Sequence, residues 1–224
     1  MAWIAIRVSI ELASSVALAL FVIGLPIAYW LAFSNWRWKF LVEAIVALPL
    51  VLPPTVLGFY VLVAIGARSP LGRAWTTLTG HGLAFTFEGL VIASILYSLP
   101  FAVQPIAAAF AQVDRTLLEA SATLGASGWR TFRELVLPLS VHGVLASVVL
   151  SFAHTLGEFG VVLMVGGNLP GATRTVSISI YDSVQSFDHA AANQTALLLL
   201  TFSFAVLAFV YAILRKPWSI APLS

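Results

Sequence analysis

Five long apolar runs constrain this chain more than any other feature of its sequence. Each is close to or above the roughly 20 residues that a helix needs to cross the hydrocarbon core of a bilayer. Their apolar residues are continuous rather than alternating, which favours helices over the strands of a barrel. The runs are residues 10–33, 40–65, 83–110, 135–165 and 196–214. The sequence therefore predicts an all-α polytopic membrane bundle with about five transmembrane helices, and 176–188 is a weaker candidate for a sixth, membrane-dipping helix.

The composition excludes several other classes of protein. Hydrophobic residues make up 60% of the 224 residues and charged residues only 9%, whereas a soluble domain carries about 25% charged residues. There is no cysteine, so neither a disulfide nor a thiolate metal site can form. The four histidines are scattered without the spacing of metal ligands: His81, His142, His154 and His189. We expect one transmembrane domain over residues 1–224, with no catalytic residue, no metal, no bound cofactor and no nucleic-acid partner.

The placement of lysine and arginine predicts which loops face the cytoplasm, because cytoplasmic loops carry an excess of both residues. If the loop 34–39 is cytoplasmic, that side holds seven basic residues: Arg37, Lys39, Arg115, Arg130, Arg133, Arg215 and Lys216. The other side then holds four: Arg7, Arg68, Arg73 and Arg174. The prediction is a multi-pass protein of the cytoplasmic (inner) membrane with its N-terminus outside and its C-terminus inside.

The most polar stretch, residues 113–135, lies between the third and fourth apolar runs. Asp114 is a plausible N-cap of a short helix of about ten residues, and Gly125 suits the left-handed position that ends such a helix. Ser127 can cap a second short helix that leads into the fourth run. The stretch therefore predicts two short helices joined by a turn on the cytoplasmic surface; the alternative is an ordinary amphipathic loop.

Segment 119–138 resembles the EAA loop of the permeases of ABC importers. That loop has Glu-Ala-Ala, three residues, Gly, nine residues, Ile, one residue and Leu-Pro. The matching positions here are Glu119, Ala120, Ser121, Gly125, Leu135, Leu137 and Pro138, with mild departures at Ser121 and Leu135. The resemblance implies a type I ABC-importer permease fold in which these residues couple the chain to an ATPase.

The same resemblance implies a homodimer that presents its two loops to two copies of a separate ABC ATPase subunit, which uses the ATP. The chain itself lacks the means to be that ATPase. A phosphate-binding loop needs Gly-Lys-Ser/Thr, and neither Lys39 nor Lys216 follows a glycine. We therefore expect a transport subunit rather than an enzyme.

Two further stretches narrow the resemblance. The sequences ALPLVLPPTVLGFY (47–60) and FAHTLGEFGVVLMVGGNLPGATRT (152–175) are similar to those of permeases for tetrahedral oxyanions, above all molybdate. Sulfate and thiosulfate permeases share a Gly-Glu-Phe/Tyr-Gly sequence like that at 157–160. The resemblance implies import of molybdate or tungstate, delivered by a separate extracytoplasmic oxyanion-binding protein, and sulfate or thiosulfate is the alternative substrate.

Five polar residues of the fourth run fall within a helical sector of roughly 60°: Ser140, Ser147, Ser151, His154 and Glu158. Ionisable groups are costly in lipid and usually face the bundle interior or a cavity. These residues are therefore candidates for lining the translocation path. The alternative is helix packing with an internal pair between His154 and Glu158; a carboxylate would repel an anion, which favours a structural role for Glu158. A proton-coupled carrier would also use this pair, but leaves segment 119–138 unexplained.

Pro53 and Pro54 interrupt the second run and predict a kink, which is either the hinge of a gate or a packing feature. Gln104 in the third run is a further candidate for the path. No lysine or arginine lies within the five runs, so we expect a transient conduit for the anion rather than a tight site. Outside the membrane, Arg68, Arg73 and Arg174 could meet the anion or its binding protein, or each could be a solvated loop charge.

Overall fold

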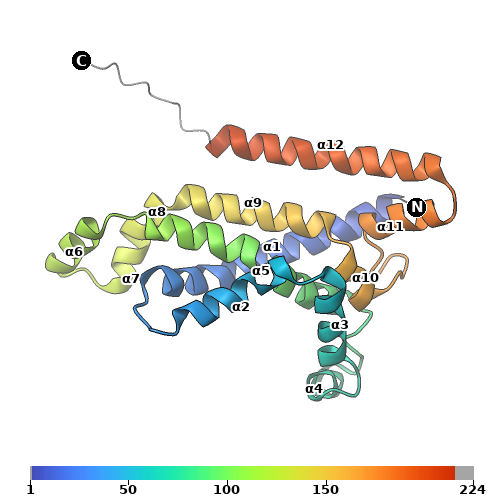
Figure 1. The fold of residues 1–224 in the computed structure, drawn as a ribbon, viewed down its shortest axis with the longest axis horizontal. Helices are drawn as coiled ribbons and strands as arrows, with labels where there is room; N and C mark the ends of the chain where they lie inside the picture. The colour runs from blue at the N-terminus through green and yellow to red at the C-terminus, as the bar shows by residue number, and fades with distance from the viewer. Residues whose placement is uncertain (1, 215–224) are drawn as a thin grey trace.

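The structure, a computed structural model, describes residues 2–214 of the chain. Every regular element in this range is helical, which confirms the predicted all-α class. In chain order (Figure 1), the longer elements are α1 (Ala2–Phe33), α2 (Lys39–Val51), α3 (Pro54–Ile65), α4 (Pro70–Thr79), α5 (Phe87–Ala111), α6 (Arg115–Thr123), α9 (Val141–Gly157), α11 (Val176–Gln185) and α12 (His189–Leu214). Between them lie the short elements α7 (Gly128–Thr131), a π-helical turn (Phe132–Val136), α8 (Leu137–Leu139) and α10 (Gly160–Gly166).

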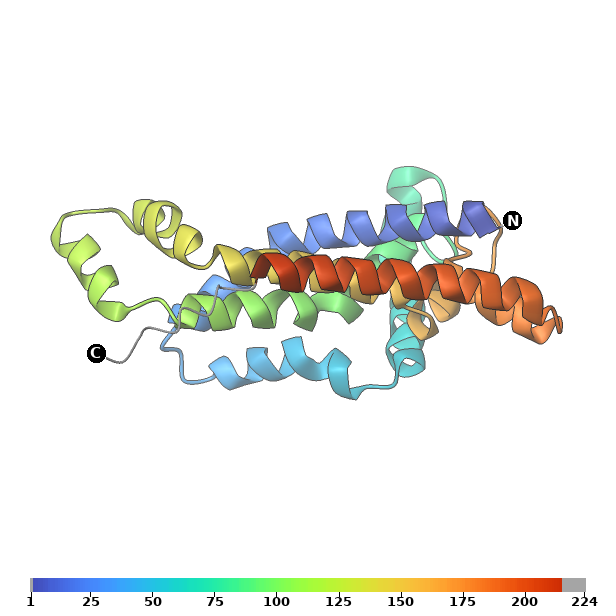
Figure 2. The same ribbon diagram turned by 90° about the horizontal axis from the view of Figure 1, so that it is seen from above.

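Helices α1, α5 and α9 pack against one another and form the core of the bundle (Figures 1 and 2). Towards the N-terminal end of α1, Leu12 and Val16 are fully buried in a cluster that includes Leu90 of α5. At the other end, a second cluster surrounds the fully buried Phe110. Helix α12 lies on the outside of the bundle along α9, and most of its described side chains are exposed, as suits a helix that faces lipid.

Three of the described helices are long and apolar enough to cross a membrane, or up to five if each of two bent helix pairs is one span. The three long helices cover Trp3–Phe33, Phe87–Ala111 and His189–Phe209. The predicted number of about five is therefore confirmed only when the bent pairs are counted. The candidate sixth span is a real helix, α11, but its 10 residues are too few to cross a bilayer.

Residues 40–65 form two helices with a sharp bend between them. Helix α2 ends at Val51, α3 begins at Pro54, and the two are bent by 113°. Consecutive prolines at 53 and 54 explain the break, because each lacks a backbone donor and restricts the residue before it. The kink expected at Pro53 and Pro54 is thus present, and it turns α3 and α4 away from the bundle (Figure 1).

Residues 135–165 are not one helix either. A bend of 73° at Ser140 separates the helical segment Gly128–Leu139 from α9. A second break follows α9, where Glu158 adopts an extended backbone conformation before α10 starts. Only the first of these breaks has a nearby proline, Pro138; the second lies between Gly157 and Gly160.

The two loops predicted to be cytoplasmic lie at one end of the bundle, and the orientation itself stays a prediction. The α1–α2 loop and the start of α6 line one common cavity, so residues 34–39 and 113–135 share one end. The N-terminal end of α1 lies at the opposite end, beside α11 (Figure 1). Arg215 and Lys216, which also entered the count of basic residues, lie outside the described residues.

Candidate functional site

The two short helices expected in 113–135 project from one end of the bundle (Figures 1 and 2). Asp114 caps α6, because its Oδ1 accepts a hydrogen bond of 2.8 Å from the backbone N–H of Thr116. This bond favours the charged carboxylate and holds the pKa of Asp114 below its ordinary value. Ser127 caps α7 by accepting a 3.3 Å bond from the N–H of Arg130. Both capping predictions are confirmed.

Gly125 forms the turn between the two helices. Its φ of 78° lies in the left-handed region that favours glycine. The N–H groups of Gly125 and Ala126 donate to the carbonyls of Ala122 and Ser121, and so close the end of α6. A residue with a side chain would be strained at this φ, so the angle between α6 and α7 depends on the glycine at position 125.

Ser121, which stands where the EAA loop has alanine, makes a contact between the two short helices. Its hydroxyl lies 2.8 Å from the hydroxyl of Thr131, and the resulting hydrogen bond ties α6 to the end of α7. An alanine at this position would lack the bond. Together with the glycine turn, it makes the two short helices one unit, which we call the coupling knob (residues 114–131).

The surface of the knob is accessible and mixes polar residues with exposed Leu124 and Trp129. Glu119 and Ala120 are both exposed, and Glu119 forms no ion pair with any residue in the described part of the chain. At the end of the knob, Arg130 donates a 2.9 Å hydrogen bond to Glu134, which lies just beyond it. That bond lowers the pKa of Glu134 and raises that of Arg130. A second protein that reached this end would find Glu119 free to pair.

Apolar contacts connect the knob to the core. Leu118 of α6 and Phe132 pack against the cluster around Phe110. The ring of Phe132 meets those of Tyr29 and Phe110 edge-on, with centroids 5.3 and 6.0 Å apart. Leu137 packs on the same cluster, Leu135 is half-buried and Pro138 is exposed. These contacts join the knob to α1 and α5.

The polar stripe of α9 faces α5. Ser140 donates a 3.3 Å bond to the carbonyl of Ala109, and Ser147 donates to the carbonyl of Val144 in its own helix. Ser147 and Ser151 are buried. This placement matches the packing alternative within one chain; a role for these serines in the path stays a prediction.

The expected pair between His154 and Glu158 is not formed. Nδ1 of His154 lies 2.9 Å from the hydroxyl of Ser98 on α5, and its ring stacks on Phe101 at 3.9 Å between centroids. Glu158 lies beyond the end of α9, where the extended backbone removes the i, i+4 geometry of a helix. Glu158 is 3% exposed, and its two carboxylate oxygens are buried without a hydrogen-bond partner among residues 2–214.

Helix α10 packs tightly on α3, next to the break at Pro53 and the break at Glu158. A Cβ on Gly160 would lie 2.7 Å from Cβ of Pro54, and a Cβ on Gly58 would lie 2.8 Å from Cβ of Met164. Both glycines thus allow the backbones of α10 and α3 to approach closely. Gly160 was not singled out, because the glycine in a Gly-Glu-Phe-Gly stretch does not indicate its partner. Pro53 is exposed at this break, and Gln104 is exposed on α5.

Arg174 is not a free loop charge. Its Nη1 lies 3.5 Å from Oδ2 of Asp182, and its Nε donates a 2.5 Å bond to Asn168. Asn168 in turn donates to Asp182 at 3.2 Å. The network ties the α10–α11 loop to α11 and offsets the charge of the arginine.

Comparison with known proteins identifies the family of this chain. Residues 24–217 match the family described as "Binding-protein-dependent transport system inner membrane component". The chain belongs to this family. It is 50% identical over 208 residues to the molybdenum transport system permease protein ModB of Azotobacter vinelandii, covering 93% of this chain and 92% of that protein. Identity to the ModB of Haemophilus influenzae is 36%, with coverage of 94% and 91%.

The more distant matches are also transport proteins. A probable sulfate transport system permease protein cysT of Chlorella vulgaris is 31% identical, with 91% of this chain and 76% of that protein covered. Among solved structures, a bacterial ABC transporter that imports alginate superimposes with a TM-score of 0.77 at 16% identity, over 96% and 79% of the two chains. The MetNI methionine ABC transporter gives 0.72 at 20% identity, over 94% and 93%. The chain is an inner-membrane transport component with the fold of a type I ABC-importer permease.

Proposed function

We propose that this chain is the permease subunit through which molybdate, or tungstate, crosses the inner membrane, driven by a separate ATPase. The observation that carries the proposal is the coupling knob: a capped, glycine-hinged pair of helices that leaves Glu119 exposed and is joined by Leu118 and Phe132 to the buried core. A knob of this kind suits a groove on another protein, because the small side chains of Ala120 and Ser121 permit close seating.

The mechanism we propose is mechanical. The ATPase grips the knob at Glu119, Ala120, Ser121 and Gly125, and its closure moves the segment that contains Leu135, Leu137 and Pro138. That segment continues through the bend at Ser140 into α9, and α9 leads through the break at Glu158 to α10. Helix α10 bears on α3 through Gly160 and Gly58, next to Pro53 and Pro54. The push thus reaches the break in the second run, which serves as the gate hinge.

A single copy supplies half of this pathway, so we propose a homodimer that presents two knobs to two ATPase subunits. Pro53 and Gln104, the path candidates on α2–α3 and α5, are exposed in the single chain and would face the second copy. ATP is used by the partner, and this chain carries neither a Gly-Lys-Ser/Thr sequence nor a catalytic set. No cofactor is needed by the permease itself.

The substrate assignment rests on the named relatives and on charge. Both cited ModB permeases are named for molybdenum transport, whereas the cysT relative is named for sulfate. The five apolar runs contain no lysine or arginine, so an oxyanion meets no fixed cation there. Arg174 is engaged by Asp182. A separate extracytoplasmic binding protein would therefore select the anion, and the permease would be a transient conduit.

Uptake by proteoliposomes tests the proposal. The chain is reconstituted with its ATPase and binding protein, and labelled molybdate is followed in competition with tungstate and sulfate. We expect ATP-dependent uptake that tungstate suppresses and sulfate leaves largely unchanged. Stronger competition by sulfate would transfer the assignment to sulfate, and uptake driven by a proton gradient without the ATPase would refute the mechanism.

A further inference from the structure

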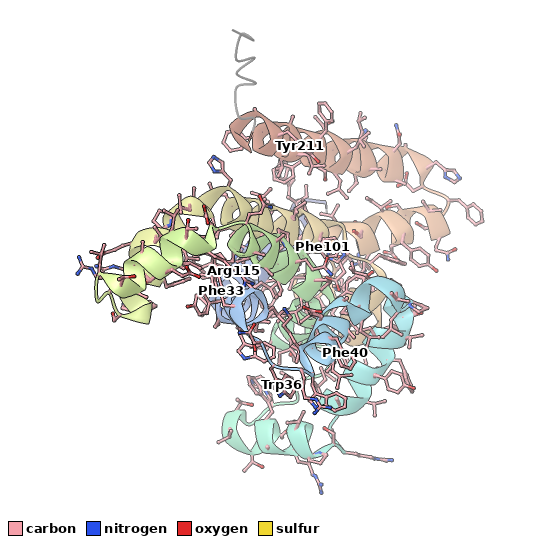
Figure 3. All side chains as sticks on the ribbon, turned by 60° about the vertical axis from the view of Figure 1, so that its left-hand side comes forward. Phe33, Trp36, Phe40, Phe101, Arg115 and Tyr211 are labelled. Atoms are coloured by element: carbon pink, nitrogen blue, oxygen red, sulfur yellow. The ribbon has the colours of Figure 1, made fainter. Side chains whose placement is uncertain are left out.

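A polar cavity lies beside the coupling knob, and the proposed function does not use it. It has a volume of about 340 Å³ and lies between the end of α1, the α1–α2 loop, the end of α5 and the start of α6. Ser34, Asn35, Lys39 and Arg115 supply its polar wall, and Phe33 and Leu118 contribute to its apolar floor. Figure 3 shows Arg115 and Phe33 side by side at this end of the bundle.

The charge of the lining suits a monoanion. Its two cations, Lys39 and Arg115, come from different elements, and its single carboxylate belongs to Glu119, which leaves a net charge of +1. Outside the lining, Glu43 lies 3.6 Å from Nζ of Lys39, so a bound anion would compete with Glu43 for Lys39, whereas Arg115 forms no ion pair with any described residue. Asp114 accepts the N–H of Thr116. Ser34 and Asn35 add hydrogen-bond donors to the same wall. A phosphodiester carries one negative charge and several acceptor oxygens, which matches this set.

The cavity lies at the depth of lipid headgroups. Trp36, Trp38 and Phe40, which flank it in the chain, are 50%, 45% and 54% exposed. Exposed tryptophans next to an apolar span mark the membrane–water interface. The guanidinium of Arg37 lies 5.2 Å from the centroid of the Trp38 ring, as in a cation–π pair at such an interface. Exposed Leu41 and Ile45 continue from this level along α2 and offer an apolar surface for acyl chains.

We propose that this cavity binds the phosphate of an anionic phospholipid from the leaflet on the side of the coupling knob. The headgroup bridges Lys39 of α2 and Arg115 of α6, and so ties the knob to the α1–α2 loop. Basic pockets between membrane helices on the cytoplasmic side are suited to anionic headgroups. Because Glu119 borders the same cavity, the bound lipid stabilises the position of the residue that meets the ATPase.

Native mass spectrometry of the purified full-length chain tests the site without relying on transport. The chain is loaded from nanodiscs of phosphatidylcholine with increasing phosphatidylglycerol, and retained phosphatidylglycerol is counted. We expect Lys39→Gln and Arg115→Gln each to weaken retention about fivefold. Arg73→Gln is the matched control, because it removes one exposed positive charge at the opposite end of the molecule.

Each remaining outcome decides the matter. Equal retention by Arg115→Gln and Arg73→Gln would overturn the site. Displacement of the lipid by inorganic phosphate in the buffer would show a soluble phosphate site, and would overturn the lipid assignment. If Arg115→Gln fails to fold, Asn35→Leu removes a donor from the exposed rim, and unchanged retention in that variant counts against the proposal. Because the readout is binding, it stands or falls separately from the proposed transport function.

Discussion

The contact between α10 and α3 makes Gly160→Ala a sharp test of the proposed force path. The new Cβ would lie 2.7 Å from Cβ of Pro54, well inside ordinary van der Waals contact. That Cβ belongs to a rigid ring fixed to the backbone, so it cannot rotate away. Overpacking of this kind costs about 1–3 kcal/mol. If the contact differs between the two orientations of the transporter, the same energy shifts their equilibrium by about 5- to 150-fold.

Gly157→Ala is the matched control, three residues earlier in the chain. A Cβ there meets nothing within 4 Å, and alanine is favoured over glycine by about 1 kcal/mol in a helix. We therefore expect Gly157→Ala to retain stability and uptake, while Gly160→Ala lowers thermal stability, ATP-driven uptake or both. Thermal unfolding in detergent and uptake by proteoliposomes measure the two effects. If the variants are indistinguishable in both assays, α10 does not bear on α3 as described.

Three further predictions concern the knob and the seam between α5 and α9. Glu119→Lys and Gly125→Pro leave the chain in the membrane but abolish ATPase association and uptake. The first reverses an exposed charge, and the second places a proline where the backbone needs a φ of 78° that proline cannot adopt. Pull-down of the ATPase would show the loss, and normal association in both variants would refute the assignment. His154→Leu impairs uptake more than His142→Leu, because only His154 bonds across to α5; equal effects would contradict an oriented seam. The capping bond of Asp114 lowers the pKa of its carboxyl group. The stability that the bond gives to α6 is therefore fully present above the ordinary aspartate pKa of about 4 and is lost as the pH falls through the lowered pKa. Amide exchange in α6 that stays unchanged across that acid range would contradict this prediction.

The coupling knob could be predicted because its structure depends on neighbouring residues in the chain. Asp114, Gly125 and Ser127 act through bonds and dihedral angles that span only a few residues. The kink at Pro53 is local for the same reason, because proline lacks the donor that a helix needs. Its angle of 113° was not predictable, since it depends on how α3 packs against α10.

The features that sequence reasoning missed depend on distant partners. His154 bonds Ser98, 56 positions away, rather than its helical neighbour Glu158. That pairing requires the crossing of α5 and α9, and the helical geometry assumed for Glu158 fails because α9 ends one residue earlier. The bond between Arg174 and Asp182 likewise depends on how a loop folds back on α11.

The central claim is that the coupling knob meets an ATPase in the cytoplasm, and site-specific labelling tests it most directly. The chain has no cysteine, so Leu124→Cys places a single thiol on the knob at a position that is 87% exposed. The account predicts that a membrane-impermeant thiol reagent labels this cysteine only from the cytoplasmic side, and that the assembled ATPase slows the reaction. Labelling from the external side, or a rate that the ATPase leaves unchanged, would contradict it.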